Sequence, residues 1–311
     1  MPLVRVLGAA ATCAAGALLA SCVSRGPQPP SLRPTPPGAT EGPVARAALT
    51  LRHACDLGDA NGCADLGMLL LQGAEGVDRN TPGALGLLAA ACDAGSALGC
   101  VRLGDAQLRG IGVPPSAARA ADLFGRACER GDAAGCRHLG ELFARGDGVT
   151  LDPQRAQSLW DRACSGGDGR ACDDLGSAAL AAGANARNAR RAADLYERAC
   201  DLDDEGGCGH LGAAYFTGTG RTRDVDRGVA LLERGCEGDD PWSCDLVARI
   251  LSRGEAGVER DMVQAVRFWQ QSCAAGDAKG CERAGAVRAC RGGARGICDA
   301  LATEGIAVTT R

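Results

Sequence analysis

The stretch CERGDAAGC, residues 128–136, decides how this chain folds, because its two cysteines and the Gly-Asp pair between them recur along the sequence. Sixteen of the eighteen cysteines form eight pairs with the spacing Cys-x₇-Cys, and the first seven pairs repeat every 36 or 37 residues. The pairs are Cys55 and Cys63, Cys92 and Cys100, Cys128 and Cys136, Cys164 and Cys172, Cys200 and Cys208, Cys236 and Cys244, Cys273 and Cys281, and Cys290 and Cys298. A period of this length predicts a solenoid of small units that bury their apolar faces against one another.

The residues around each cysteine pair predict two helices joined by a turn. Ala120, Leu123 and Ala127 precede Cys128 at offsets that place them on one helical face, and the same offsets recur in other units. The Gly-Asp pair predicts a left-handed helix end followed by an N-cap. A Leu-Gly pair follows the second cysteine. Its glycine, Gly140 in this unit, costs about 1 kcal/mol relative to alanine inside a helix, so we expect it to mark a close contact between helices.

The cysteine spacing tests this hairpin. On one continuous helix, residues eight apart lie ~12 Å apart along the axis, whereas a disulfide needs Cα atoms within ~7 Å. We therefore expect eight nearest-neighbour disulfides, each pinning two antiparallel helices across their short turn. Buried thiols in a reducing compartment are the alternative. Zinc is disfavoured, because its ligand pairs stand about two to four residues apart and often include His, and the chain has only three His.

The N-terminal sequence predicts export. Arg5 precedes an apolar run from Val6 to Ala20, and Leu19-Ala20-Ser21-Cys22 has the small residues and the cysteine of a lipoprotein box. The run is shorter than the ~20 residues of a spanning helix, although an uncleaved anchor remains the alternative. We expect a signal peptide over 1–21 and acylation of Cys22, which would anchor the chain to a membrane surface. Val23 favours the outer membrane, so the mature chain would be periplasmic or on the cell surface.

The rest of the chain divides into a tether, an array and a tail. Seven of the thirteen prolines lie between Ser24 and Pro43, which predicts an extended, lipid-anchored tether over 22–43. The repeat array is expected over 44–303, and a short tail over 304–311. Export would place the array in an oxidising compartment, where regularly spaced cysteines are normally paired.

Between the hairpins lie loops such as Gly146-Asp147-Gly148-Val149. Leu-Gly, then Gly-x-Gly-Val, an acidic residue, and Ala and Leu at helical spacing together resemble the Sel-1-like repeat family, over about Val44 to Leu301. The cysteine pair in each repeat resembles the secreted, cysteine-rich Hcp branch of that family. The resemblance implies an all-α, right-handed superhelical solenoid of disulfide-stapled antiparallel helix pairs, similar to tetratricopeptide arrays.

Three places depart from the repeat pattern. The loops after Cys172 and Cys208 differ from Gly-x-Gly-Val, and we expect both to be remodelled. At the C-terminal end the loop and one helix are missing, so we expect Cys281 and Cys290 to share a helix and Cys298 to lie on a short cap.

The resemblance implies two different functions. Sel-1-like repeats generally bind proteins or peptides along a superhelical surface, whereas cysteine-rich members are described as penicillin-binding proteins with weak β-lactamase activity. Lys279 is the only lysine and no serine stands three residues before it, so the Ser-x-x-Lys motif of serine β-lactamases is absent. His53, His138 and His210 form no His-x-x-x-His motif. We therefore expect a binding scaffold without cofactor or metal, with a β-lactamase-like hydrolase as the alternative.

Two columns of side chains are candidates for ligand contact. The first, which we call the arginine column, stands two residues before the first cysteine and suits carboxylates or phosphates; the alternative is pairing with Glu129, Asp201 or Glu237, three residues on. The arginine column consists of Arg126, Arg162, Arg198 and Arg234. The second, the variable column, stands two residues after the second cysteine and is expected to be exposed, each repeat making its own contact on a concave face; solvent-exposed drift is the alternative. The variable column includes Arg102, His138, Asp174 and His210.

The net charge of −4, with signs that alternate along the chain, argues against nucleic acid as a partner. The expected partner is therefore a protein, a peptide or a cell-wall ligand, besides the membrane that a lipid anchor would contact. Trp160, Trp242 and Trp269 form no aromatic cluster that resembles a cofactor site, and no strand is predicted.

Overall fold

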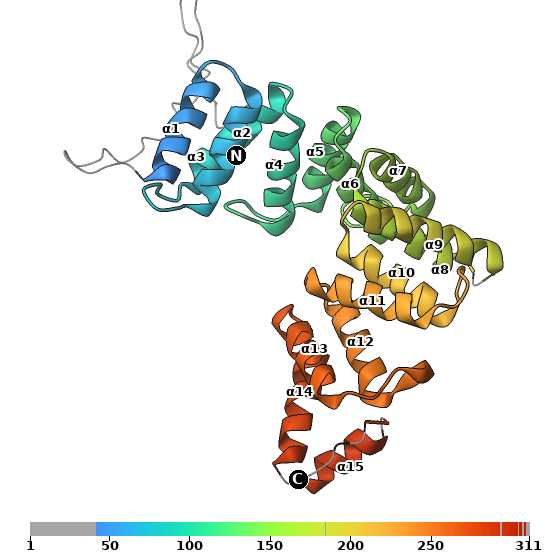
Figure 1. Cartoon of the computed structure of the whole chain (residues 1–311). Coiled ribbons are helices and arrows are strands. Elements are labelled where there is room, and N and C mark those ends of the chain that lie inside the picture. The colour runs from blue at the N-terminus through green and yellow to red at the C-terminus, as the bar shows by residue number, and fades with distance from the viewer. Residues whose placement is uncertain (1–41, 184, 293, 304, 307, 309–311) are drawn as a thin grey trace, which may run out of the picture.

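The computed structural model describes residues 42–183, 185–292, 294–303, 305–306 and 308, and in this part of the chain every named element is a helix (Figure 1). The signal peptide, Cys22 and nearly all of the tether lie outside the described residues. The helices are α1 (Pro43–Asp56), α2 (Ala60–Gln72), α3 (Thr81–Asp93), α4 (Ala97–Arg109), α5 (Ala117–Glu129), α6 (Ala133–Arg145), α7 (Pro153–Ser165), α8 (Gly169–Ala181), α9 (Ala186–Asp201), α10 (Glu205–Thr217), α11 (Val225–Glu237), α12 (Pro241–Arg253), the 3₁₀ turn η1 (Glu255–Gly257), α13 (Met262–Ala274), α14 (Ala278–Arg291) and α15 (Arg295–Thr303).

Successive helices pair into hairpins, and the hairpins stack into a curved array that runs from α1 to α15 (Figure 1). The all-α solenoid of stapled helix pairs is therefore confirmed. Within the described residues no helix combines the length and the apolar character needed to cross a bilayer.

Most of the hairpins turn through all or part of the predicted Gly-Asp segment. In the third hairpin, Gly131 has a left-handed backbone with φ of 87°, and Asp132 Oδ1 accepts a hydrogen bond from the Gly135 N–H at 2.7 Å, capping α6. In the two turns that lack this glycine, Asp203 (φ 57°) and Asp239 (φ 64°) adopt the same left-handed conformation. The hairpin therefore requires a left-handed backbone at this position, and glycine adopts that conformation at a lower free-energy cost than aspartate does.

All eight nearest-neighbour disulfides are present, and their Cα atoms lie 4.4 to 4.9 Å apart. Closing a loop of this length stabilises the folded chain by about 2.5 kcal/mol per bond in the chain-entropy model. The last three cysteines are also placed as predicted, with two on α14 and one on the shorter α15. The bonds join Cys55 to Cys63, Cys92 to Cys100, Cys128 to Cys136, Cys164 to Cys172, Cys200 to Cys208, Cys236 to Cys244, Cys273 to Cys281 and Cys290 to Cys298.

The glycine of each Leu-Gly pair faces a large side chain of the next helix. A Cβ on Gly140 would lie 2.7 Å from the Trp160 ring, and one on Gly104 would lie 2.6 Å from Phe124. The pairs Gly67 with Leu88, Gly176 with Tyr196 and Gly212 with Leu232 repeat this arrangement. The predicted close contact is confirmed. Its partner is the residue four before the next first cysteine, a column of large side chains that the sequence analysis did not single out.

The two loops expected to be remodelled differ in outcome. After Cys172, α8 ends at Ala181 and its C-cap residue is Ala182 with φ of −69°, where the regular loops have a left-handed glycine; α9 has 16 residues, where most helices of the array have 13. After Cys208 the expectation is wrong, because Gly218 and Gly220 have φ of 80° and 76°, close to the values in the regular loops. The two glycines determine the backbone there, whichever residue follows them.

A glycine-to-alanine pair tests the close contact. Gly140→Ala should lower the free energy of unfolding by about 1–3 kcal/mol, because the new methyl group would displace the Trp160 ring. Gly125→Ala, inside α5, should instead raise it by up to about 1 kcal/mol, since its Cβ would meet only Leu139 at 3.9 Å. Denaturant unfolding measures both. Equal stabilisation by the two variants would contradict the contact.

Candidate functional site

The even-numbered helices line the inner face of the arc. Those of neighbouring hairpins also contact each other, as α2 does with α4 and α8 does with α10. An arc brings together the elements on its inner side, so these helices form its concave surface. The second cysteine of the first seven pairs lies on an even-numbered helix, and the variable column that follows it therefore belongs to this inner face.

The variable column is half-buried, and the expectation of exposed side chains is wrong for its four candidate residues. The side chains of His138 and His210 are 21% and 31% exposed, and each contacts a carboxylate of the preceding repeat. His138 Nε2 lies 4.0 Å from Asp105 Oδ1, and His210 Nδ1 lies 2.6 Å from Asp173 Oδ1. Neighbouring even-numbered helices approach closely enough for the side chain at this position to contact the preceding repeat. Arg102 and Asp174 lie on α4 and α8 at the equivalent positions.

His138 belongs to a charged cluster between α6 and α8. Its Nδ1 lies 3.5 Å from Glu141 Oε2, and Arg137 donates to Glu141 Oε1 at 2.5 Å and to Asp168 Oδ2 at 3.0 Å. Burial would raise the pKa of Glu141, but the hydrogen bond from His138 and the charge of Arg137 lower it. Asp168 caps α8 through the Ala171 N–H, so the cluster ties α6 to the start of α8.

Asp174 has a strongly perturbed carboxyl group. Burial raises the pKa of Asp174 to about 7, and the negative charges of Glu141 and Asp173 add to the rise. Arg170 and Arg137 act in the opposite direction. The buried Asp174 Oδ2 finds no hydrogen-bond partner among the described residues. The inner face therefore contains a carboxyl group that titrates near neutral pH.

His210 lies at the centre of an aromatic cluster. Its ring centroid is 4.9 Å from that of Tyr196 and 4.7 Å from that of Trp242, whose side chain is 42% exposed. Burial would lower the pKa of His210, but its hydrogen bond to Asp173 and the nearby charges raise it. The sequence predicts no cofactor-like cluster around the tryptophans, and it did not indicate this contact of Trp242 with His210. Its partners lie 32 and 46 residues earlier in the sequence, so only the stacking of repeats brings them together.

Two neighbouring pockets meet at His210. The apolar pocket has a volume of about 200 Å³ and is walled by Tyr196, His210 and Trp242 together with small residues of α9 and α10. The acidic pocket has a volume of about 450 Å³. Its charged or titratable lining residues are Arg170, Asp173, Asp174, Asp204, Glu205, His210, Asp239 and Asp240. Within the described part of the chain, no group of three or more His, Cys, Asp or Glu is arranged to hold a metal ion.

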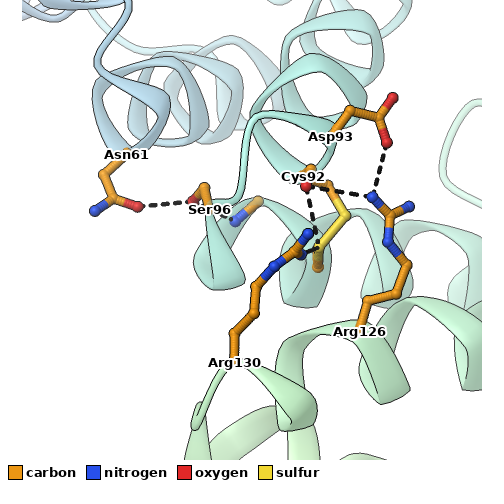
Figure 2. Close-up of a disulfide and its surroundings, with 8 residues drawn as sticks. Asn61, Cys92, Asp93, Ser96, Arg126 and Arg130 are labelled. Atoms are coloured by element: carbon orange, nitrogen blue, oxygen red, sulfur yellow. Dashed lines mark hydrogen bonds and ion pairs between the residues drawn. A yellow bond between two sulfur atoms is a disulfide. The ribbon is translucent and has the colours of Figure 1, made fainter.

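The arginine column bonds to the preceding repeat. Arg126 Nη2 donates to the Cys92 carbonyl at 3.3 Å and to Asp93 Oδ1 at 2.8 Å, as Figure 2 shows beside the disulfide between Cys92 and Cys100. Arg162, Arg198 and Arg234 donate to the equivalent cysteine carbonyls at 2.5, 3.0 and 3.3 Å. Each of these carbonyls lies at a helix end, where it also accepts a hydrogen bond from the backbone N–H three residues on, at 2.9 to 3.2 Å, so the arginine is a second donor.

The pairing expected three residues along the same helix is therefore not the arrangement found. Arg126 pairs with Asp93 and Arg234 with Asp203, both in the preceding repeat. An arginine side chain is long enough to cross the interface between repeats, and the carbonyl end of a helix attracts its positive charge. The arginine column joins repeats, and a role in ligand binding stays a prediction.

The carboxylates that partner the variable column were not predicted from the sequence. They stand one or five residues after the second cysteine, as Asp173, Asp245, Asp105 and Glu141 do. Asp245, for example, accepts from Trp269 Nε1 at 3.1 Å and from Arg283. The residues at the fifth position lie three after the variable column, on the same helical face, and this spacing is the signal that could have identified them.

Comparisons with known proteins agree with this architecture. The Sel1 repeat model matches residues 60–96, 97–132, 133–168, 170–204, 207–240 and 243–277. No curated protein sequence matches the chain. The fold is similar to that of a Sel1 repeat protein from Oxalobacter formigenes, with a TM-score of 0.65 and 20% identity over 73% of this chain and 96% of that one.

A second similar structure is c5321, a protective antigen present in uropathogenic Escherichia coli strains and displaying an SLR fold. The TM-score is 0.61 and the identity 26%, over 81% of this chain and 53% of the antigen, so the alignment spans about half of the antigen's length. Cysteine rich protein B of Helicobacter pylori is 29% identical over 44% of this chain and 98% of its own, with a TM-score of 0.37.

Replacing Asp174 tests the buried carboxyl group. An unfolded aspartate titrates near ~4, whereas burial raises the pKa of Asp174 in the folded protein to about 7. The folded state therefore binds this proton more tightly, and the group lowers stability progressively as the pH rises between these two values. Asp174→Asn should accordingly raise the free energy of unfolding at pH 8 by roughly 1–3 kcal/mol and change it little at pH 4.

Denaturant unfolding at the two pH values measures this difference. Asp65→Asn, at the exposed position of the same column, is the matched control and should have little effect at either pH. Loss of stability in Asp174→Asn at pH 8 would mean that the nearby arginines stabilise the carboxylate, and would contradict the assignment.

Proposed function

The chain belongs to the Sel1 repeat family, and we propose that it is a lipid-anchored, extracytoplasmic scaffold that binds a protein or peptide along the inner face of its solenoid. Sel1 repeats typically mediate interactions between proteins. The observation that carries the proposal is the inner face itself. Its framework glycines and cysteines repeat, while the variable column reads His138, Asp174, His210 and Leu246 in four successive hairpins and so differs in charge and shape. Such variation on a regular frame suits a ligand that spans several repeats.

Three features support this location and class of partner. Eight disulfides persist in an oxidising compartment and suggest an extracytoplasmic protein. The Leu19-Ala20-Ser21-Cys22 box is the basis for the lipid anchor. The guanidinium groups of the arginine column already bind carbonyls of the frame, which weakens the case for an anionic cell-wall ligand there. A protein or peptide on the inner face is the partner that we favour.

Site-specific photocrosslinking tests the binding face. A photoreactive residue at Asp65 or Trp242, both exposed on even-numbered helices, should crosslink one and the same envelope protein. The same residue at Gln157, exposed on α7, is the control and should not. Crosslinks from Gln157 alone would move the binding surface to the outer helices and overturn the proposal.

The anchor has its own test. Cys22→Ala should give a species that is soluble or still carries its leader, because the lipid chains supply the membrane affinity. Cys13→Ala, which changes the other unpaired cysteine, should leave processing and fractionation unchanged. Membrane fractionation and mass spectrometry of the mature N-terminus report both. A processed Cys22→Ala protein that still sediments with membranes would exclude the lipid anchor.

The hydrolase implied by the cysteine-rich relatives is not proposed. Lys279 remains the one lysine of the sequence, without the Ser-x-x-Lys motif. Turnover of a chromogenic β-lactam by purified protein whose eight disulfides have been verified by mass mapping would favour the hydrolase over the binding scaffold.

A further inference from the structure

One stretch of the inner face, between α9 and α12, differs from the rest of the array. Trp242 stands two residues before the second cysteine of its pair. The other repeats carry at this position Asn61, Leu98, Ala134, Arg170, Gly206 and Lys279. An exposed aromatic side chain on the binding face of a scaffold is a candidate anchor for a partner, because aromatic residues contribute much of the binding energy at interfaces.

A glycine makes the position of Trp242 possible. At Gly209 a Cβ would lie 1.8 Å from Ser243 Oγ and 3.2 Å from Ser243 Cβ, so a side chain there would displace the buried Ser243 hydroxyl from the contact between α10 and α12. The three neighbouring hairpins carry at the equivalent position Arg137, Asp173 and Asp245. The close approach lets the Trp242 ring lie 4.7 Å from His210 and close one side of the apolar pocket.

The size of the apolar pocket restricts what can occupy it. Its volume of about 200 Å³ is below the ~300–1,000 Å³ of sites that enclose a whole small-molecule ligand. Ala189, Ala192 and Ala213 line it together with the rings of Tyr196 and Trp242. These surfaces suit a single large apolar side chain that belongs to a larger partner.

The charge of the adjoining pocket restricts the neighbouring residues of that partner. Six carboxyl groups line the acidic pocket, against the positive charges of Arg170 and His210. Asp204 and Asp240 cap α10 and α12 and partly neutralise those helix ends. Glu205 and Asp239 are exposed. The pocket therefore carries an excess of negative charge that a lysine or arginine side chain would complement.

We propose that this junction is a subsite for a basic peptide segment, with a large apolar side chain between Tyr196 and Trp242 and a following Lys or Arg among the carboxylates beyond His210. The assignment rests on the proposed scaffold function and names the chemistry of its partner. His210 is the shared wall of the two pockets, so the apolar residue and the basic residue of the peptide lie next to each other in sequence.

Fluorescence anisotropy with three labelled peptides tests the subsite in the purified, disulfide-bonded mature chain. The peptides are Gly-Ser-Phe-Lys-Lys-Ser-Gly, the same peptide with Ala for Phe, and the same peptide with Glu for both lysines. The Phe-Lys-Lys peptide should bind at least tenfold more tightly than either of the others. Equal binding of the Ala-Lys-Lys peptide would reduce the site to unspecific electrostatic attraction and overturn the proposal, as would equal binding of the Phe-Glu-Glu peptide.

Variants locate the effect. Trp242→Ala should weaken binding of the Phe-Lys-Lys peptide at least tenfold, and Trp242→Phe should retain most of it. The pair Glu205→Gln with Asp239→Asn should also weaken it at least tenfold, with Asn tolerating the left-handed backbone of Asp239. Glu129→Gln with Asp161→Asn, two exposed residues of α5 and α7, is the charge-matched control and should leave binding unchanged.

The outcomes separate this subsite from the scaffold. Unchanged affinity in Trp242→Ala, with circular dichroism of the folded protein unaltered, would overturn the subsite. Weak or equal peptide binding combined with a crosslink from Asp65 would overturn the subsite and leave the scaffold standing. A tenfold loss in both site variants, with no loss in the control pair, would support it.

Discussion

The disulfide across each helix turn is the constraint on which the rest of this structure depends. It holds the end of one helix within 4.4 to 4.9 Å of the start of the next, measured between Cα atoms. Only 3% of the residues are aromatic, so the small units gain much of their stability from this covalent closure. The same turn presents the carbonyl of its first cysteine to the following repeat, where an arginine binds it (Figure 2). The disulfide within one hairpin thereby positions the carbonyl that binds the arginine of the next hairpin.

Stacking then relies on a match between small and large side chains. The inner helices from α2 to α10 each have a glycine, such as Gly104, against which the next helix places a large residue, such as Phe124. The backbones approach closely, and their apolar faces become a shared core. The same proximity brings inner-face side chains of neighbouring repeats together, so charged residues there are half-buried and paired. His138 with Asp105 and His210 with Asp173 are the examples.

The inner face therefore contributes to stability, and under the proposed function it also binds the partner. Its paired charges join adjacent helices, and Asp174, whose pKa is raised to about 7 by burial, makes the middle of the array sensitive to pH. Gly209 and Trp242 depart from the residues at the equivalent positions of other repeats. Beside them the inner face contains two pockets, in addition to contacts between repeats. A partner would be selected at such departures, because the regular positions already contact one another.

The sequence by itself determined the hairpins, the disulfide pairs, the Gly-Asp turns and the close contact at the Leu-Gly glycines, together with the position of the variable column after each second cysteine. These features depend on spacings of a few residues and on a period that repeats them, so local geometry suffices to predict them. Only the tertiary structure decided the partners of the arginine column, the burial of His138 and Asp174, and the contact of Trp242 with His210. These contacts join residues about 30 or more positions apart, and they depend on the rotation and rise from one repeat to the next. Packing of whole hairpins sets that rotation and rise, and no local spacing encodes them.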